Sequence, residues 1–198
     1  DADVDGVRFL NSRKITGAIP EMLDEAERFV VQNTKTAIVV DENGQRCDRT
    51  EYPMRAIREA ILNALIHRDY SPYSESSPIR LEIYSDRIEV VSKGDIYGAV
   101  PVSALGHMEI GKRNAFLVDI LEAVHKTENR NSGILTMRTE CRKRNLPEPI
   151  FYCVHGEFKV IFKNSQPADN IVFDRTMAEK TILDFCELPR SREELAAF

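Results

Sequence analysis

Apolar side chains recur at every fourth position between Pro53 and Tyr70, and this spacing predicts a helix. Ile57, Ile61 and Leu65 lie one helical turn apart and would face a hydrophobic core. Most residues of the segment are good helix formers, and Pro53 suits a first helical position because its missing N–H would be unpaired there. We expect the rest of the chain to be organised around this helix.

The remainder of the chain shows both helical and strand periods. Together they predict an α+β fold, a two-layer α/β sandwich with one mixed sheet and helices on one face. We expect Leu135 and Met137 to face the core in one helix, and Phe116, Ile120 and Leu121 to belong to the apolar face of another. The further predicted helices are 20–32, 114–124 and 134–144, and the predicted strands are 36–40, 46–50, 79–84, 87–91, 150–154 and 157–162.

A polar stripe runs along the central helix. Glu59, Asn63 and His67 recur every fourth residue and lie roughly opposite the isoleucine stripe. One interpretation is a solvated polar surface, which is the commoner use of such a face. The other is a site that brings a carboxylate, a carboxamide and an imidazole together. The helix alone does not decide between them.

Amino-acid composition argues against several classes of function. The 198 residues are 42% hydrophobic, enough for a core, and the net charge of −5 argues against a chain that wraps nucleic acid. No stretch approaches the apolar length of a membrane span. Four scattered cysteines without a CxxC pair argue against a zinc ribbon or a disulfide framework. A reducing compartment, the cytoplasm, is therefore expected.

Three polar segments have two interpretations each. The loop with Gly94 and Gly98 is either a tight turn or a place where backbone approaches a ligand. Lys112-Arg113-Asn114 precedes a predicted helix, where it could contact phosphate or make structural ion pairs. The basic run 142–144, with Arg138 before it, either contacts phosphate or compensates a helix dipole.

Six separated motifs of this chain follow the order seen in one family. The chain resembles the C-terminal ATPase-like domain of bacterial proteins that carry the names RecG-related DNA helicase and divergent AAA-type transcriptional regulator. Through it, the chain is similar to the GHKL ATPases, which include DNA gyrase and the histidine kinases. The resemblance extends over about residues 15–163, and its motifs are Ala56–Ala60 with Asn63–Leu65, His67–Tyr70, Asp86–Val90, Arg113-Asn114, Ser132–Ile134 and Leu146–Phe151.

The resemblance implies an ATP site with Mg²⁺ as cofactor. In the superfamily a helical glutamate activates water and an asparagine holds Mg²⁺ across the phosphates. Glu59 and Asn63 match these positions, so Glu59 would be catalytic and Asn63 would bind both nucleotide and metal. His67 would touch phosphate or have a structural role. The remaining nucleotide-binding candidates are Gly94, Arg113, Asn114, Ser132 and Gly133.

The chain departs from the superfamily in its first glycine box. The superfamily has Asp-x-Gly-x-Gly, whose Asp bonds adenine, and here Ser92 and Ile96 replace the Asp and the second Gly. We therefore expect a nucleotide-binding regulatory domain with at most weak ATPase activity. The alternative is a non-catalytic dimerisation or interaction module that has lost nucleotide binding. Helicase activity is not expected, because the sequence has no GxxxxGK[ST] P-loop.

The resemblance also predicts the domain organisation. Residues 1–14 would be the tail of an upstream AlbA/Schlafen-type domain, and 15–165 the GHKL-like domain. Residues 166–175 would be a linker, and 176–198 the start of a winged-helix module, where Ser191 to Glu194 form a capping box. DNA would be bound through these flanking domains, and the chain could form a homodimer.

Overall fold

The computed structural model describes residues 10–40, 44–98, 100–108, 110–123 and 133–165. The chain divides into two compact units, Asp1–Ser165 and Gln166–Phe198, and all of the described residues belong to the first. The predicted linker, the predicted winged-helix module, Ser132 and most of the predicted upstream tail lie outside the described residues. The domain limits therefore stay predictions.

The secondary structure follows the predicted elements closely, and their existence and type are confirmed. The helices are α1 Ile19–Asn33, α2 Met54–His67, α3 Ala115–Ala123 and α4 Gly133–Lys143. The strands are β1 Thr36–Val40, β2 Arg46–Thr50, β3 Arg80–Ile83, β4 Arg87–Lys93, β5 Ile150–Val154 and β6 Glu157–Lys163, and the 3₁₀ turns are η1 Pro72–Ser74 and η2 Val102–Ala104. The central helix starts one residue later than expected, with Pro53 as its N-cap.

The α+β class and the α/β sandwich are confirmed, but the expected single mixed sheet is wrong in two respects. β3, β4, β6 and β5 pair in that order, and every neighbouring pair among them is antiparallel. β1 and β2 form a separate two-stranded hairpin. The physical reason is the connectivity. The segment between β4 and β5 returns the chain to the far edge, so that β6 runs back beside β4 in the opposite direction.

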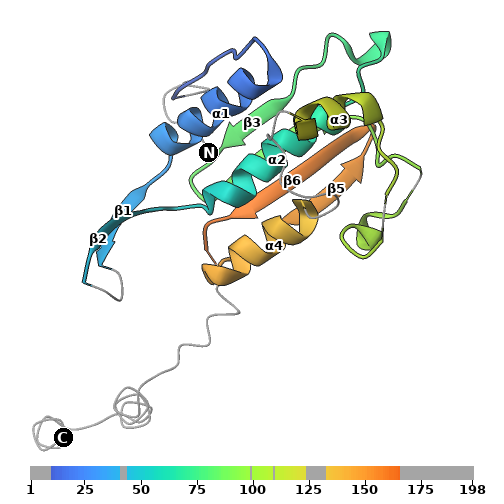
Figure 1. Ribbon diagram of the computed structural model, residues 1–198. Coiled ribbons are helices and arrows are strands. Elements are labelled where there is room, and N and C mark those ends of the chain that lie inside the picture. The colour runs from blue at the N-terminus through green and yellow to red at the C-terminus, as the bar shows by residue number, and fades with distance from the viewer. Residues whose placement is uncertain (1–9, 41–43, 99, 109, 124–132, 166–198) are drawn as a thin grey trace, which may run out of the picture. The chain divides into compact units, whose positions relative to one another are not determined.

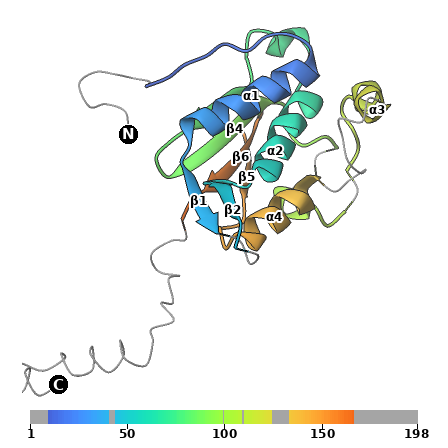
Figure 2. The ribbon, with the colours of Figure 1, turned by 60° about the vertical axis from the view of Figure 1, so that its left-hand side comes forward.

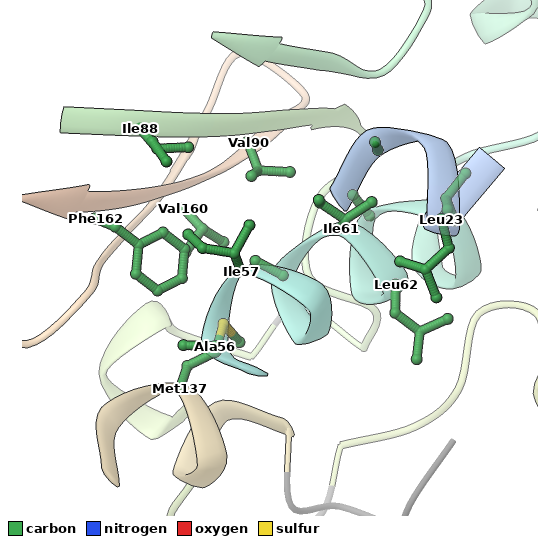
Figure 3. Close-up of a cluster of buried hydrophobic side chains, with 14 of the residues drawn as sticks. Leu23, Ala56, Ile57, Ile61, Leu62, Ile88, Val90, Met137, Val160 and Phe162 are labelled. Atoms are coloured by element: carbon green, nitrogen blue, oxygen red, sulfur yellow. The ribbon is translucent and has the colours of Figure 1, made fainter. Parts of the chain in front are cut away.

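α1, α2 and α4 lie on one face of the four-stranded sheet, with α2 between α1 and α4 (Figure 1). Figure 2 shows the same layer turned by 60°, with α2 beside β4, β6 and β5. α2 buries eight residues, among them the predicted Ile57, Ile61 and Leu65. Ile57 and Ile61 point toward Ile88 and Val90 of β4 in the core (Figure 3). The prediction that the chain is organised around this helix is confirmed.

The apolar faces of α3 and α4 were predicted only in part. Met137 is buried as expected, whereas Leu135 is 58% exposed. In α3 Val118 and Leu121 are buried, and Phe116 is 78% exposed. Both helices are short, and apolar side chains occur on more than one of their faces. Which face is buried depends on where the helix packs.

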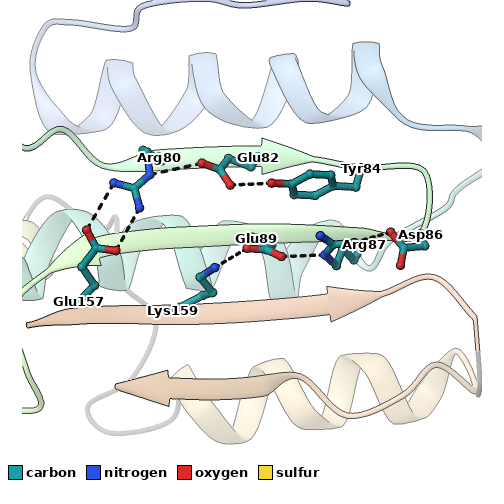
Figure 4. A network of polar contacts seen from close by, with 8 residues as sticks. All are labelled: Arg80, Glu82, Tyr84, Asp86, Arg87, Glu89, Glu157 and Lys159. Carbon is teal, nitrogen blue, oxygen red and sulfur yellow. Dashed lines mark hydrogen bonds and ion pairs between the residues drawn. The ribbon is translucent and has the colours of Figure 1, made fainter. Parts of the chain in front are cut away.

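The sheet face opposite the helices carries a network of paired charges (Figure 4). Arg80 pairs with Glu157 at 3.0 Å, and Glu89 accepts hydrogen bonds from Arg87 at 2.7 Å and Lys159 at 2.6 Å. Burial raises the pKa of Glu89, but these hydrogen bonds outweigh it and lower the pKa below its ordinary value. These charged side chains are thus paired with one another. The cavity described next lies on the opposite side of the sheet, where the helices pack.

Candidate functional site

A cavity of about 440 Å³ lies between α2, the first turn of α4 and the ends of β4 and β6. Residues between β4 and α3 complete its wall. Its inner surface is largely apolar, with Ala60, Ala64, Val90 and Val160 among the lining side chains. The volume is within the range of about 300–1,000 Å³ that is typical of small-molecule sites.

The polar stripe of α2 lines this cavity. Glu59, Asn63 and His67 all contribute to its wall; Glu59 and Asn63 are half-buried, whereas His67 is exposed. Asn63 is half-buried, and its carboxamide has no hydrogen-bond partner among the residues that the structure describes. A half-buried amide without a partner is costly unless water or a ligand supplies one. The stripe therefore presents a polar group available to a ligand.

Gly133 brings the first turn of α4 against this stripe. A Cβ atom at Gly133 would lie 2.5 Å from Glu59 Oε1 and 2.9 Å from Asn63 Nδ2. Such separations are shorter than real Cβ atoms show. Only glycine leaves room for the carboxylate and carboxamide as they stand, so Gly133 belongs to the site by its missing side chain.

Gly94 is placed at the cavity by its backbone conformation. Its φ of +117° is rarely adopted by other residues, and a Cβ there would lie 3.1 Å from the backbone nitrogen of Asp69. The same Asp69 N–H donates to the carbonyl of Lys93 at 2.8 Å. Gly94 thus lets the end of β4 meet the residues that follow α2. Gly94 makes a tight turn and also lines the cavity, and its approach to a ligand stays a prediction.

Positive charge gathers near the end of α2. Lys112 and Arg113 line the cavity together with His67. Arg113 Nη2 donates to the carbonyl of Asp95 at 2.8 Å, which holds its side chain in place. Partial desolvation lowers the pKa of His67, and the charges of Lys112 and Arg113 lower it further. The arrangement favours binding of an anion, which would relieve the repulsion among these groups.

Asn114 lies outside the cavity lining. Its Nδ2 donates to the carbonyl oxygens of Ile66 at 2.7 Å and Arg68 at 2.9 Å. These bonds satisfy backbone groups at the C-terminal end of α2 and attach α3 there. Of the predicted ligand residues that the structure describes, Asn114 is not part of the cavity wall. The others line the cavity: Glu59, Asn63, His67, Gly94, Arg113 and Gly133.

The motif that follows His67 organises the next loop. Arg68 Nη2 donates to the carbonyls of Ser74 and Ser77, each at 2.7 Å. The Asp69 carboxylate accepts from the Ser71 N–H at 2.9 Å and the Ser74 hydroxyl at 2.8 Å. The backbone hydrogen bond from Ser71 is the largest of the causes that lower the pKa of Asp69. These two residues therefore shape the chain beside the cavity.

The basic run at the end of α4 makes structural contacts. Arg142 pairs with Glu148 at 2.6 Å and Lys143 with Glu140 at 2.8 Å. Arg144 Nη1 donates to the backbone carbonyl of Thr50 at 2.8 Å. These pairings favour the structural interpretation over phosphate contact.

Ser92 and Asp95 were not among the predicted site residues, although both line the cavity. Ser92 is buried on β4, and the signal was available, because a serine in a row of core positions along a strand is unusual. Asp95 carried no such signal, since its position depends on the path of the loop after β4.

The described part of the chain has neither a metal-binding cluster nor a membrane-spanning helix. Among the described residues, no group of three or more His, Cys, Asp or Glu side chains could hold a metal ion. No described helix has both the length and the apolar character needed to cross a membrane. Cys141 is buried, and burial raises the pKa of its thiol to about 11.

Comparison with known proteins agrees with the resemblance. Residues 76–162 match the family described as "Putative ATP-dependent DNA helicase recG C-terminal". A crystal structure of the DIP2311 protein from Corynebacterium diphtheriae is similar, with a TM-score of 0.69 and 25% identity over 83% of this chain. The match covers 34% of that chain, so the sequence spans about a third of its length. No curated protein matches. The matched residues 76–162 begin after α2, so the roles of Glu59, Asn63 and His67 stay predictions.

Proposed function

We propose that the ATPase-like domain of this chain, which is related to the RecG C-terminus, binds a nucleoside triphosphate with Mg²⁺ in the cavity beside α2. The observation that carries the proposal is the unpartnered carboxamide of Asn63 in the cavity wall, between Glu59 and His67 on the same helix face. ATP is the first candidate, because the family description names an ATP-dependent protein.

The distribution of polarity supports this ligand class. Apolar side chains such as Ala64, Val90 and Val160 line the inner part of the cavity and suit a planar heterocycle. His67, Lys112 and Arg113 suit a polyanion. A nucleotide has both an apolar heterocycle and a polyanion in one molecule, whereas a purely apolar ligand would make no use of the basic groups.

The chemistry of Mg²⁺ is consistent with Asn63 as its protein ligand. Mg²⁺ prefers six oxygen ligands and usually keeps several waters, so one or two protein groups and the phosphates can hold it. The Asn63 carbonyl oxygen would supply one ligand. Nucleotide and metal would then bind together, because the phosphates supply further oxygens. The metal, when bound, would neutralise phosphate charge.

Glu59 is the candidate base for hydrolysis. Its carboxylate lies in the cavity wall one helical turn before Asn63, against the first turn of α4. A carboxylate in this position could orient a water molecule for attack on the terminal phosphate. We propose slow turnover as a secondary activity. Glu59→Gln should abolish turnover while retaining nucleotide binding, and equal rates in the two proteins would exclude this role.

Isothermal titration of the 198-residue chain with ATP and ADP, with and without Mg²⁺, tests the main proposal. Asn63→Ala should weaken Mg²⁺-dependent binding by about tenfold or more, because it removes a metal ligand. Gln32→Ala removes an exposed carboxamide from α1 and serves as the matched control. Absence of heat and of any thermal shift at millimolar nucleotide would refute the proposal. The interaction module would then be the better hypothesis, and light scattering would test it as a homodimer.

We further propose that the domain has a regulatory role in a DNA-associated protein of the cytoplasm. The support is the family description, which names a DNA helicase. DNA binding would depend on segments outside residues 15–165. Gel-shift assays that compare the whole chain with residues 15–165 would test this, because residues 15–165 alone should not retard duplex DNA at physiological salt. Retardation by that shorter segment would place the DNA contact in the ATPase-like domain instead.

A further inference from the structure

We infer that the edge strand β5 pairs with β5 of a second copy of this chain, so that two four-stranded sheets join into one continuous sheet. The surface involved lies at the opposite edge of the sheet from β3 (Figure 1). Tyr152, at the centre of this surface, is not among the residues that line the cavity. The inference therefore goes beyond the proposed function and does not depend on nucleotide binding.

The backbone of β5 has one free side. β5 is the last strand in the sheet order β3-β4-β6-β5, and among the described strands it pairs with β6 alone. The turn η2 lies near β5, but none of the backbone hydrogen bonds of the described residues joins the two. An edge strand presents a row of backbone N–H and C=O groups to any strand of suitable length. β5 thus provides a template for the addition of another strand.

The two edges of the sheet differ in the features that protect an edge from pairing. β3, at the opposite edge, carries the charged Arg80 and Glu82, and α1 lies against it. Charged side chains and cover by a helix both discourage edge-to-edge pairing. β5 has the sequence Ile-Phe-Tyr-Cys-Val, with neither a charge nor a proline. Of the two edges, β5 is therefore the open one, and the protected β3 would limit the assembly to two copies.

The side chains of β5 that point away from the core are apolar and exposed. Tyr152 lies opposite Lys159 of β6 and Val154 lies opposite Glu157, so both share the outer face of the sheet with the charge network (Figure 4). Tyr152 is 48% exposed and Val154 is 54% exposed. An apolar stripe thus runs along the free edge. The same stripe of a second copy would cover it, whereas a charged partner would find no counter-charge on β5 itself.

The ends of β5 set the register of the pairing. Pro149, directly before the strand, has no N–H to donate, and His155, directly after it, has a φ of +52° that ends the extended backbone. Pairing is thereby confined to five residues. An antiparallel arrangement with Tyr152 on the two-fold axis pairs all of them, with Ile150 opposite Val154 of the second copy. A shift by one residue would turn the helices of the second copy to the opposite face.

This arrangement favours the chain itself as the partner. Both strands of the pair carry the same uncharged side chains, so no like charges meet across the axis. The two Tyr152 side chains would meet there, where the Cβ atoms of directly opposite residues lie about 4.5–5.5 Å apart. Five paired residues from each copy bury less than the roughly 1,200 Å² of a standard interface. The dimer should therefore be weak, with a Kd in the micromolar range.

Sedimentation velocity of the intact 198-residue chain without nucleotide tests the inference, and we expect a reversible monomer–dimer equilibrium. Tyr152→Glu should raise its Kd by about tenfold or more, because two carboxylates would meet at the axis. Lys159, opposite the new carboxylate on β6, should keep the folded monomer stable. Leu135→Glu changes a comparably exposed apolar residue of α4, so it is the matched control and should dimerise like the parent.

An exchange of charge separates a specific interface from a general loss of association. Tyr152→Lys should also be monomeric by itself, because two ammonium groups would meet. An equimolar mixture of Tyr152→Glu and Tyr152→Lys should regain dimers, because opposite charges then face each other across the axis. Thermal midpoints close to that of the parent would show that both variants fold.

Each outcome has a distinct meaning. A parent chain that stays monomeric at a concentration of about 200 µM overturns the inference, and so does growth into assemblies larger than a dimer. A dimer that Tyr152→Glu leaves intact refutes the role of β5. A mixture of the two charged variants that stays monomeric refutes the position of Tyr152 on the axis. Nucleotide titration is scored separately, since its failure would end the proposed function and leave the dimer untouched.

Discussion

Replacing Gly133 with alanine should displace the side chains of Glu59 and Asn63 while changing the stability of the fold little. The added Cβ would lie 2.5 Å from Glu59 Oε1, whereas ordinary contacts begin at 3.4 Å, so the carboxylate must move by about 0.9 Å. Asn63 Nδ2, at 2.9 Å, must move by about 0.5 Å. Both atoms end flexible side chains, so the backbone need not shift.

The effect on stability should be small. Gly133 is the first helical residue of α4 and does not have a positive φ, so alanine is compatible with its conformation. Alanine is better than glycine in a helix by up to about 1 kcal/mol, which offsets the rearranged contacts. The effect on function should be large. A displacement near 1 Å can reduce turnover by about a hundredfold, and we expect nucleotide affinity to fall by about tenfold.

The assay combines titration calorimetry with urea unfolding, and Gly44→Ala is the control. Gly44 lies between β1 and β2 with a φ of +77°, and no atom of the described residues outside its chain neighbours lies within 4 Å of the place that a Cβ would take. That variant should lose about 1 kcal/mol of stability, because alanine disfavours this conformation, and should bind nucleotide normally. If Gly133→Ala binds nucleotide within twofold of the parent, the close contact does not position the two side chains and the reasoning is refuted.

Two further predictions concern stability. Glu89→Gln should lower the free energy of unfolding at pH 7 by about 1–3 kcal/mol, because it weakens charge-assisted hydrogen bonds. The pKa of Glu89 lies below its ordinary 4.5 in the folded chain. The stability difference between the parent and Glu89→Gln should therefore be complete above pH 4.5 and should vanish as the pH falls through the folded-state pKa. Asp48→Asn, at an exposed position, is the matched control in these urea titrations. A difference that persists unchanged at low pH would contradict this account. Asn114→Ala should cost about 1–3 kcal/mol in the same assay, because the carbonyls of Ile66 and Arg68 lose their donor. Unchanged stability would show that water replaces the amide there.

The local elements were predictable because their signals are local. The recurrence of Ile57 and Ile61 at every fourth residue depends only on helix geometry, and the alternation in β4 depends only on the pleat. The exposed Leu135 and Phe116 were not predictable in the same way, because a short apolar helix has several possible core faces. Sheet pairing failed for a related reason. The alternation of apolar and polar residues within one strand does not indicate whether its neighbour runs parallel or antiparallel to it.

The candidate site was predictable to a smaller extent. Spacing placed Glu59, Asn63 and His67 on one face, and the resemblance to a family added residues from later loops. No local pattern could show that Gly133 touches Glu59, since the two are far apart along the chain and only the packing of α4 on α2 joins them. Asn114 was predicted to bind nucleotide because it follows Arg113 in a family motif. Its side chain instead donates a hydrogen bond to a backbone carbonyl at the end of α2.

The sequence by itself determined the helices, the strands and the polar stripe of α2, because these follow from periods that each segment carries within itself. Tertiary structure alone decided that the stripe lines a cavity and that Gly133 leaves room for Glu59. The physical reason is that burial and close contact are properties of pairs of elements. They arise only when α2, α4 and β4 pack together.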